Sequence, residues 1–283
     1  MKKFLPKKFR NEGVTIPVVR LSGVIASGGS ALKQNLSLAS CATVLDKAFS
    51  DKKAPAVAIS INSPGGSPVQ SRQIYLRIRQ LAKEKNKKVH VFVEDVAASG
   101  GYMIAVAGDD ITVDPSSIVG SIGVVSASFG FPKLLEKIGV ERRVYTAGQN
   151  KATLDPFKPE KKSDIAHLKS LQLEIHDVFI DMVKQARGDR LSDDPNLFTG
   201  LFWAGKKGVE LGLVDSIGDM RSSLKELYGK DTTLKLIEAK KGLFGRSKTG
   251  ISSSFFNADI SQQLTEGALN AVEERALWSR FGL

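Results

Sequence analysis

The sequence contains one cysteine, three histidines and two tryptophans among 283 residues. A single cysteine excludes an internal disulfide framework and is typical of a reducing compartment. Cys41 lies in an apolar, helix-like segment, which favours a buried structural thiol over a nucleophile. His167 and His176 are nine positions apart on one predicted helix and therefore lie on opposite faces, and His90 falls within a predicted strand. Because no zinc-type spacing of ligands occurs either, we expect no metal and no cofactor.

Long apolar runs are also missing. No stretch approaches the roughly 18 consecutive apolar residues that a membrane-spanning helix needs. Residues 1–10 (MKKFLPKKFR) hold five basic residues, and no apolar region of a signal peptide follows them. The formal net charge is +11, but the basic residues are scattered and lack interleaved aromatic residues, which argues against nucleic-acid binding. We expect the basic start to be disordered or to touch an anionic membrane surface.

Short strand-like and helix-like segments alternate along the chain. This alternation predicts an α/β fold with a mainly parallel sheet and repeated βαβ units. We divide the chain into a basic segment (1–13), one domain (14–240) and a linker with a C-terminal helical tail (241–283). The predicted strands are 14–26, 56–61, 89–93, 111–113, 118–125, 142–145 and 233–237, and the main predicted helices are 37–49, 68–86, 99–107, 132–138 and 164–188.

Two glycine-rich turns follow two of these predicted strands. One contains Gly65 and Gly66, and the other contains Ser99, Gly100 and Gly101. In parallel α/β sheets, ligands collect at the carboxyl ends of the strands, so both turns are expected at one rim. Taken alone, a serine at a strand-to-helix junction is usually a helix N-cap, and Pro-Gly-Gly is usually a tight turn.

Lys151 is a candidate base in a polar segment, Gly148-Gln149-Asn150-Lys151. Most lysines are solvated charges with a pKa near 10.4 and are therefore poor bases. A lysine acts as a base only where desolvation or nearby positive charge lowers its pKa. No acidic residue precedes Asp155 in this part of the sequence, which permits burial of Lys151 without showing it.

Four motifs together resemble the signal peptide peptidase A family of serine peptidases, including its SohB-like members. They are INSPGG (61–66), AASGGY (97–102), DPSSIVGSIGV (114–124) and GQNKATLDPF (148–157). A later segment, WAGKKGVELGLVD (203–215), is similar to the family's W-x-G-x-x-A-x-x-x-GLVD pattern, with Gly208 in place of alanine. The resemblance covers roughly residues 14–230.

The resemblance implies a ClpP/crotonase-like fold and a Ser-Lys dyad. By position in the motifs, Ser99 matches the nucleophile, Lys151 the general base, and Ser121 the serine that orients the lysine amine. Gly66 and Gly100 match the backbone donors of the oxyanion hole. The family also implies a ring-like homo-oligomer in which neighbouring subunits can complete the dyad, and a substrate that is a signal-peptide remnant or another unfolded polypeptide.

Many members of this family carry an N-terminal membrane anchor, and we find none here. We therefore expect a cytoplasmic protein, with contact to the inner membrane only through its basic start. Two alternative functions stay open at this point. One is a crotonase-type enzyme that acts on an acyl thioester through a carboxylate, with Glu94 and Asp95 as weak candidates. The other is a non-catalytic scaffold of the same fold.

Overall fold

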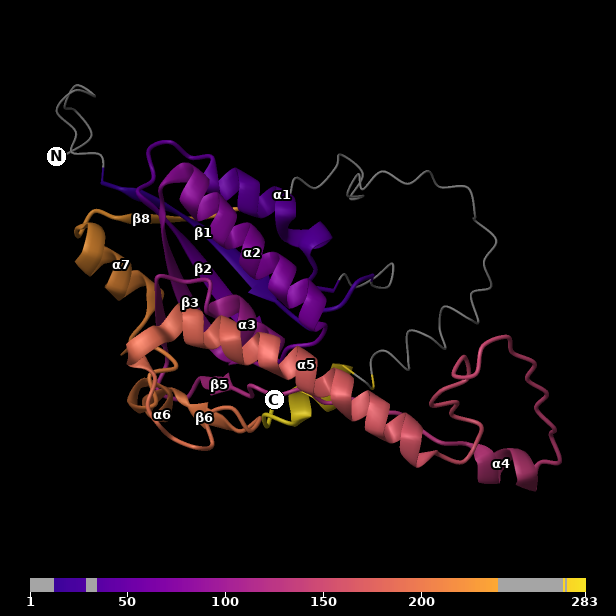
Figure 1. Ribbon diagram of the computed structural model, residues 1–283. Coiled ribbons are helices and arrows are strands. Elements are labelled where there is room, and N and C mark those ends of the chain that lie inside the picture. The colour runs from indigo at the N-terminus through magenta and orange to yellow at the C-terminus, as the bar shows by residue number, and fades with distance from the viewer. Residues whose placement is uncertain (1–12, 29–34, 239–271, 273) are drawn as a thin grey trace, which may run out of the picture.

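A single sheet organises the protein. The computed structural model describes residues 13–28, 35–238, 272 and 274–283. In spatial order the sheet runs β6-β5-β3-β2-β1-β8, with β4 also paired to β3 and β7 paired to β4 (Figure 1). The strands are β1 (Thr15–Ser22), β2 (Ala56–Ser63), β3 (Lys88–Ala98), β4 (Asp110–Val113), β5 (Ile118–Gly120), β6 (Phe202–Ala204), β7 (Ser216–Ile217) and β8 (Thr233–Leu236).

Every pairing in the sheet is parallel except that of β5 with β6. The helices are α1 (Leu38–Phe49), α2 (Pro68–Lys85), α3 (Gly100–Ala105), α4 (Pro132–Lys137), α5 (Lys162–Arg187), α6 (Gly205–Glu210) and α7 (Met220–Tyr228), with a short 3-10 turn at Gly188–Arg190. The mainly parallel sheet and its βαβ units confirm the predicted fold class, which agrees with a ClpP/crotonase-like fold.

The main core lies between the sheet and the layer of α1, α2, α3 and the carboxyl-terminal part of α5. Strand β2 is buried along its whole length, as its continuous apolar run predicts. A smaller cluster on the opposite face packs Leu224 of α7 against Ile16 and Phe92. Cys41 is buried in the main core, and burial raises the pKa of its thiol to about 12, which confirms a structural role.

Helix α1 begins as the sequence predicts. The Ser37 hydroxyl accepts a hydrogen bond from the Ser40 backbone N–H, and the Ser40 hydroxyl accepts one from the Ser37 N–H. This reciprocal pair satisfies two backbone donors that the first turn of a helix leaves free.

Several predicted boundaries were wrong. Strand β3 runs to Ala98, beyond the predicted end at residue 93, because the polar residues Glu94 and Asp95 continue the strand and bind Arg20 and Asn62. Strand β5 ends at Gly120, well before residue 125, because Gly120 and Ser121 both adopt positive φ. The strand predicted at 142–145 is absent: these residues have no regular structure. Residues 1–12 and most of the predicted linker and tail, 239–271, lie outside the described residues.

A long projection, which we call the arm, leaves the sheet after Gly123. It comprises residues 124–161, includes α4, and returns to the body through α5 (Figure 1). No residue of the arm is buried. Helix α5 is likewise exposed along its amino-terminal half, and its buried residues begin only at Phe179.

Candidate active site

Three neighbouring strands end at the same rim, and each delivers a predicted site residue. Strand β2 leads into Pro64-Gly65-Gly66, β3 leads into Ser99, and β5 leads into Ser121. Because β3 pairs in parallel with both β2 and β5, these three turns lie side by side. The structure therefore places Gly66, Gly100, Ser99 and the backbone of Ser121 together, as the sequence predicts for the glycine turns.

Ser99 sits in a strained turn between β3 and α3. Its φ of 52° and ψ of −122° are unusual for a residue with a side chain. It occupies the N-cap position of α3, yet its hydroxyl makes no cap hydrogen bond and has no recorded partner in the described part of the chain. Ser99 is thus an N-cap by position only, and its half-buried hydroxyl does not cap the helix.

Glycine is required at both positions of the turn after β2, because backbones approach closely here. A methyl group placed on Gly65 would lie 2.8 Å from Ser99 Cβ and 2.9 Å from the Gly100 nitrogen. One placed on Gly66 would lie 2.1 Å from the Ile25 carbonyl oxygen, at a φ of +141°. A side chain at Gly65 would therefore collide with the turn that holds Ser99, and one at Gly66 would collide with the backbone of Ile25.

Gly66 and Gly100 present neighbouring N–H groups. A methyl group on Gly100 would lie 3.3 Å from the Gly66 nitrogen, so the two peptide units are adjacent. Neither N–H donates a recorded hydrogen bond within the described ranges, although the flanking residues do: Ser67 N donates to Ile25 O at 2.7 Å. Gly100 also starts α3, where backbone N–H groups lack helical acceptors and favour negative charge. Two such donors beside a serine hydroxyl are the groups that can stabilise an oxyanion.

Side chains to which the sequence analysis gave no role in the site hold these turns. Ser63 donates to Gly23 O at 2.7 Å and accepts from Gly65 N at 3.2 Å. Ser71, fully buried in α2, donates to Ser67 O at 2.8 Å, and its hydroxyl lies against Gly100. His176 of α5 hydrogen-bonds through Nε2 to Ile122 O at 3.0 Å, which fixes the chain just after Ser121. Small serines give no periodic signal, so only the three-dimensional structure reveals these roles.

The Ser99 pocket has a volume of about 220 Å³ and is mostly apolar. It is lined by Pro64, Gly66, Pro68, Ser99, Gly100, Met103, Gly123, Val124, Val125, Ile175, Phe179, Leu277 and Arg280. Neither Glu94 nor Asp95 lines it. Glu94 binds Arg20 at 2.6 and 2.7 Å, and these hydrogen bonds hold the pKa of Glu94 below its usual range. Asp95 accepts a hydrogen bond from Asn62.

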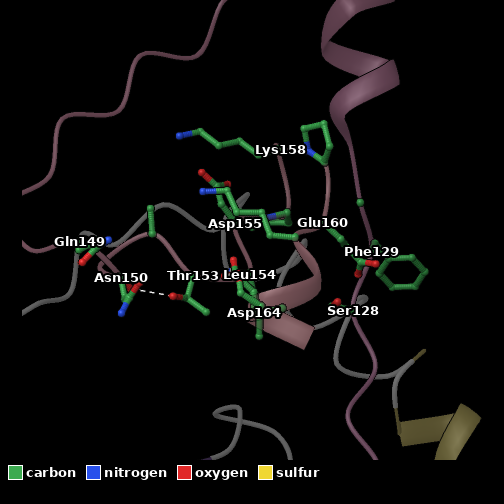
Figure 2. A pocket seen from close by; sticks show the side chains of 16 residues that line it. Ser128, Phe129, Gln149, Asn150, Thr153, Leu154, Asp155, Lys158, Glu160 and Asp164 are labelled. Atoms are coloured by element: carbon green, nitrogen blue, oxygen red, sulfur yellow. Dashed lines mark hydrogen bonds between the residues drawn. The ribbon is translucent and has the colours of Figure 1, made fainter. Parts of the chain in front are cut away.

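Lys151 is not brought to Ser99 within one chain. It is exposed on the arm, in a turn where its N–H donates to Gly148 O at 3.2 Å. Its neighbours line a second pocket of about 310 Å³ (Figure 2). In that pocket Thr153 donates to Asn150 O at 2.7 Å, and Leu154 N donates to Asp164 at 3.1 Å. These bonds give the lysine turn a defined shape at a site remote from the Ser99 pocket.

Asp155 also lines this second pocket, which lies on the arm. One of its carboxylate oxygens accepts hydrogen bonds from Phe157 N and from Arg142, which lower the pKa of this carboxyl. The other oxygen is buried without a hydrogen-bond partner among the described residues.

The described residues contain no group of three or more histidine, cysteine or acidic side chains able to hold a metal ion. They also contain no helix long and apolar enough to cross a membrane.

A family model described as peptidase family S49 matches residues 81–232, more than half of the chain. The chain belongs to this family. A putative protease of Synechocystis is 33% identical over 75% of the chain and 78% of the relative. A putative signal peptide peptidase SppA of Enterococcus faecium is 29% identical over 87% of the chain and 72% of the relative. Both agree with the resemblance to signal peptide peptidase A and SohB-like peptidases.

A Brucella abortus protein named as a Na(+)/H(+) antiporter, NhaA, is 63% identical over the full length of this chain. The chain spans only 39% of that relative. The matched segment of the relative thus corresponds to this S49 chain, and the remaining 61% of the relative has no counterpart here.

Proposed function

We propose that this S49 peptidase is a serine endopeptidase with a Ser-Lys dyad that works through an acyl-enzyme. The observation that carries the proposal is the strained turn of Ser99. Its hydroxyl lies beside the N–H groups of Gly66 and Gly100, and none of the three has a hydrogen-bond partner among the described residues. A strained nucleophile next to preorganised donors is the arrangement that acyl transfer requires.

Each proposed residue has one chemical task. Neutral Lys151 accepts the Ser99 proton, and Ser99 Oγ attacks the carbonyl carbon of the scissile peptide bond. The N–H groups of Gly66 and Gly100 stabilise the oxyanion, and one such donor is typically worth about 2.7–4 kcal/mol. Lys151 then protonates the leaving amine, and water hydrolyses the acyl-enzyme. Ser121, buried beside the site, would hold the lysine amine in position.

We further propose that assembly completes the dyad: Lys151 of one copy meets Ser99 of a neighbour in a ring-like homo-oligomer. The exposed position of Lys151 on the arm supports this, because an isolated arm cannot desolvate its amine. Exposed apolar side chains on the arm and α5, including Phe129 (74% exposed) and Leu173 (62%), give the arm a surface suited to a second copy.

The mostly apolar lining of the Ser99 pocket supports apolar peptide segments as substrates, such as signal-peptide remnants or other unfolded polypeptides. A crotonase-type reaction is less well supported, because none of the described residues that line this pocket carries a carboxylate. A scaffold role gives no reason for a strained serine with a free hydroxyl.

Fluorophosphonate labelling with peptide mapping tests the proposal. We expect an adduct on Ser99 that is lost in Ser99→Ala and Lys151→Ala. Mixing these two variants under conditions that exchange subunits should restore peptide hydrolysis if the dyad forms between copies. An assembled, folded protein without any adduct would contradict the peptidase proposal. An active Lys151→Ala variant would contradict the assignment of the base.

A further inference from the structure

The end of the chain lies against the pocket that holds Ser99. Residues 274–279 are helical, and Phe281 is only 9% exposed. Phe281 packs with Val96 and Ala98 of β3, and its ring meets that of Phe202 edge to face at 5.0 Å between centroids. Since Ala98 directly precedes Ser99, this contact anchors the C-terminal segment beside the nucleophile.

Two residues of this segment, Leu277 and Arg280, line the Ser99 pocket. Leu277 extends the apolar wall formed by side chains such as Ile175 and Phe179. Arg280 is the one charged residue among the described residues of the lining. Its positive charge therefore sets Arg280 apart from the uncharged residues of the lining.

The Arg280 guanidinium has no carboxylate partner in the described part of the chain. Its one recorded contact is with the Phe281 ring, at 5.8 Å from the guanidinium carbon to the centroid. By contrast, Arg187 and Arg190 on the body both pair with Asp215. Among the residues that the structure describes, Arg280 thus presents a cation without a carboxylate partner at the edge of an apolar pocket.

We propose that Arg280 is a specificity-determining residue that binds a carboxylate of the peptide substrate. The guanidinium fork matches a carboxylate with two parallel hydrogen bonds, and it stays charged at all relevant pH values. An apolar side chain of the same peptide would fill the pocket. This inference rests on the proposed peptidase function and adds a substrate class to it: apolar peptides that carry a carboxylate close to the bound segment.

The carboxylate can come from the free C-terminus of a short peptide or from an aspartate or glutamate side chain. Three fluorescent peptides of leucine and alanine distinguish these sources. One has a free C-terminal carboxylate, the second has a C-terminal amide, and the third has the amide together with one internal glutamate. Their binding is measured by fluorescence anisotropy on the Ser99→Ala protein, which cannot cleave them under the proposed mechanism.

We expect the carboxylate peptide, the glutamate peptide or both to bind about tenfold more tightly than the neutral amide peptide. Arg280→Ala in the same background should remove this preference and leave the affinity for the amide peptide within about twofold. Arg280→Lys should retain part of the preference, because it keeps the charge and loses the fork. Raising the salt concentration should reduce the preference.

Arg275→Ala is the matched control, because Arg275 is exposed on the same helical segment and does not line the pocket. A preference that survives Arg280→Ala, or falls equally in Arg275→Ala, overturns the inference. Equal binding of all three peptides, or no binding of any, overturns it as well. Melting temperatures of the variants check that the C-terminal segment stays docked.

The test of Arg280 can fail without the peptidase proposal failing, and the reverse also holds. On the Ser99-containing enzyme, Arg280→Ala should raise KM for the preferred peptide and leave kcat and fluorophosphonate labelling of Ser99 nearly unchanged. Labelled Ser99 with no effect of Arg280→Ala rejects the specificity role alone. Unlabelled Ser99 with carboxylate-dependent binding at Arg280 rejects the peptidase proposal alone.

Discussion

The backbone N–H of Ser99 donates a 2.8 Å hydrogen bond to the carbonyl oxygen of Gly120. This bond follows directly on the pairing of Ala98 with Gly120, where β3 and β5 both end. Beyond that point Ser99 and Ser121 turn away with similar positive φ values of 52° and 54°. The hydrogen bond between the Ser99 and Gly120 backbones therefore fixes the two predicted site serines, Ser99 and Ser121, relative to each other.

The strained Ser99 backbone predicts that activity is maintained at a cost in stability. A non-glycine residue in such a conformation costs about 1–3 kcal/mol, whereas glycine adopts it freely but loses about 0.5–1 kcal/mol through its greater freedom when unfolded. We expect Ser99→Gly to raise the free energy of unfolding by about 1 kcal/mol in urea denaturation and to abolish labelling. Ser99→Ala keeps Cβ and should unfold like the wild type. A marked loss of stability in Ser99→Gly would show that the hydroxyl has a structural partner.

Gly100 and Ser71 form a second testable pair. A methyl group on Gly100 would lie 2.3 Å from Ser71 Oγ, closer than any real contact, whereas its next neighbours are at 3.3 Å. We expect Gly100→Ala to lower the free energy of unfolding by about 1–3 kcal/mol and to reduce the rate of hydrolysis strongly. Adding Ser71→Ala removes the clashing oxygen and should restore most of both. Equal defects in the single and double variants would place the problem in the oxyanion donors themselves.

The buried ion pair of Arg187 with Asp215 predicts a contribution to the free energy of unfolding that is lost in acid. Arg187 donates to both carboxylate oxygens of Asp215 at 2.8 and 2.9 Å, and its side chain is 1% exposed. Burial alone would raise the pKa of Asp215, but the hydrogen bonds and charge of Arg187 outweigh it and lower the pKa. Asp215→Ala leaves the Arg187 charge buried, so we expect a loss of about 3 kcal/mol at pH 7.

The pH dependence follows from the lowered pKa of Asp215. The pair stabilises the protein fully above the unfolded pKa of about 3.9, and this stabilisation is lost as the pH falls through the lower folded pKa. Urea denaturation of the wild type and Asp215→Ala should therefore give a constant difference above about pH 5 that shrinks below about pH 4. The double variant Arg187→Met/Asp215→Leu should be less destabilised than Asp215→Ala. A difference that grows in acid would contradict the assignment.

Hydrophobic patterns predicted most of the fold, because buried strands and amphipathic helices have strong local signals. Strand β2 and helix α2 are examples, and their bounds differ from prediction by two residues or fewer. The end of β3 was missed because its polar residues face partners on other strands: Glu94 binds Arg20, which is distant in sequence. Such pairings become visible only when the sheet is assembled.

Part of the site could be predicted, because its glycines also give a local signal in the sequence. Glycines after strands locate Gly66 and Gly100, because close backbone approach needs residues without side chains. The position of Lys151 relative to Ser99 was not predictable, since the arm has no buried residue that ties it to the body. No sequence pattern placed Arg280 in the site. It lines the Ser99 pocket in the folded protein, where Phe281 packs on Ala98.

Leu173 offers a test of whether the exposed face of α5 is covered by another copy. Its side chain is 62% exposed on the half of the helix that leaves the body. A charge at this position is harmless to a solvated helix but is costly inside an apolar interface. We expect Leu173→Glu to lower the molar mass seen by light scattering and to reduce labelling of Ser99, with an unchanged circular dichroism spectrum. Gln73→Glu adds the same charge at an exposed polar site on α2 and should leave the assembly intact. Equal masses for Leu173→Glu and the wild type would place the interface elsewhere.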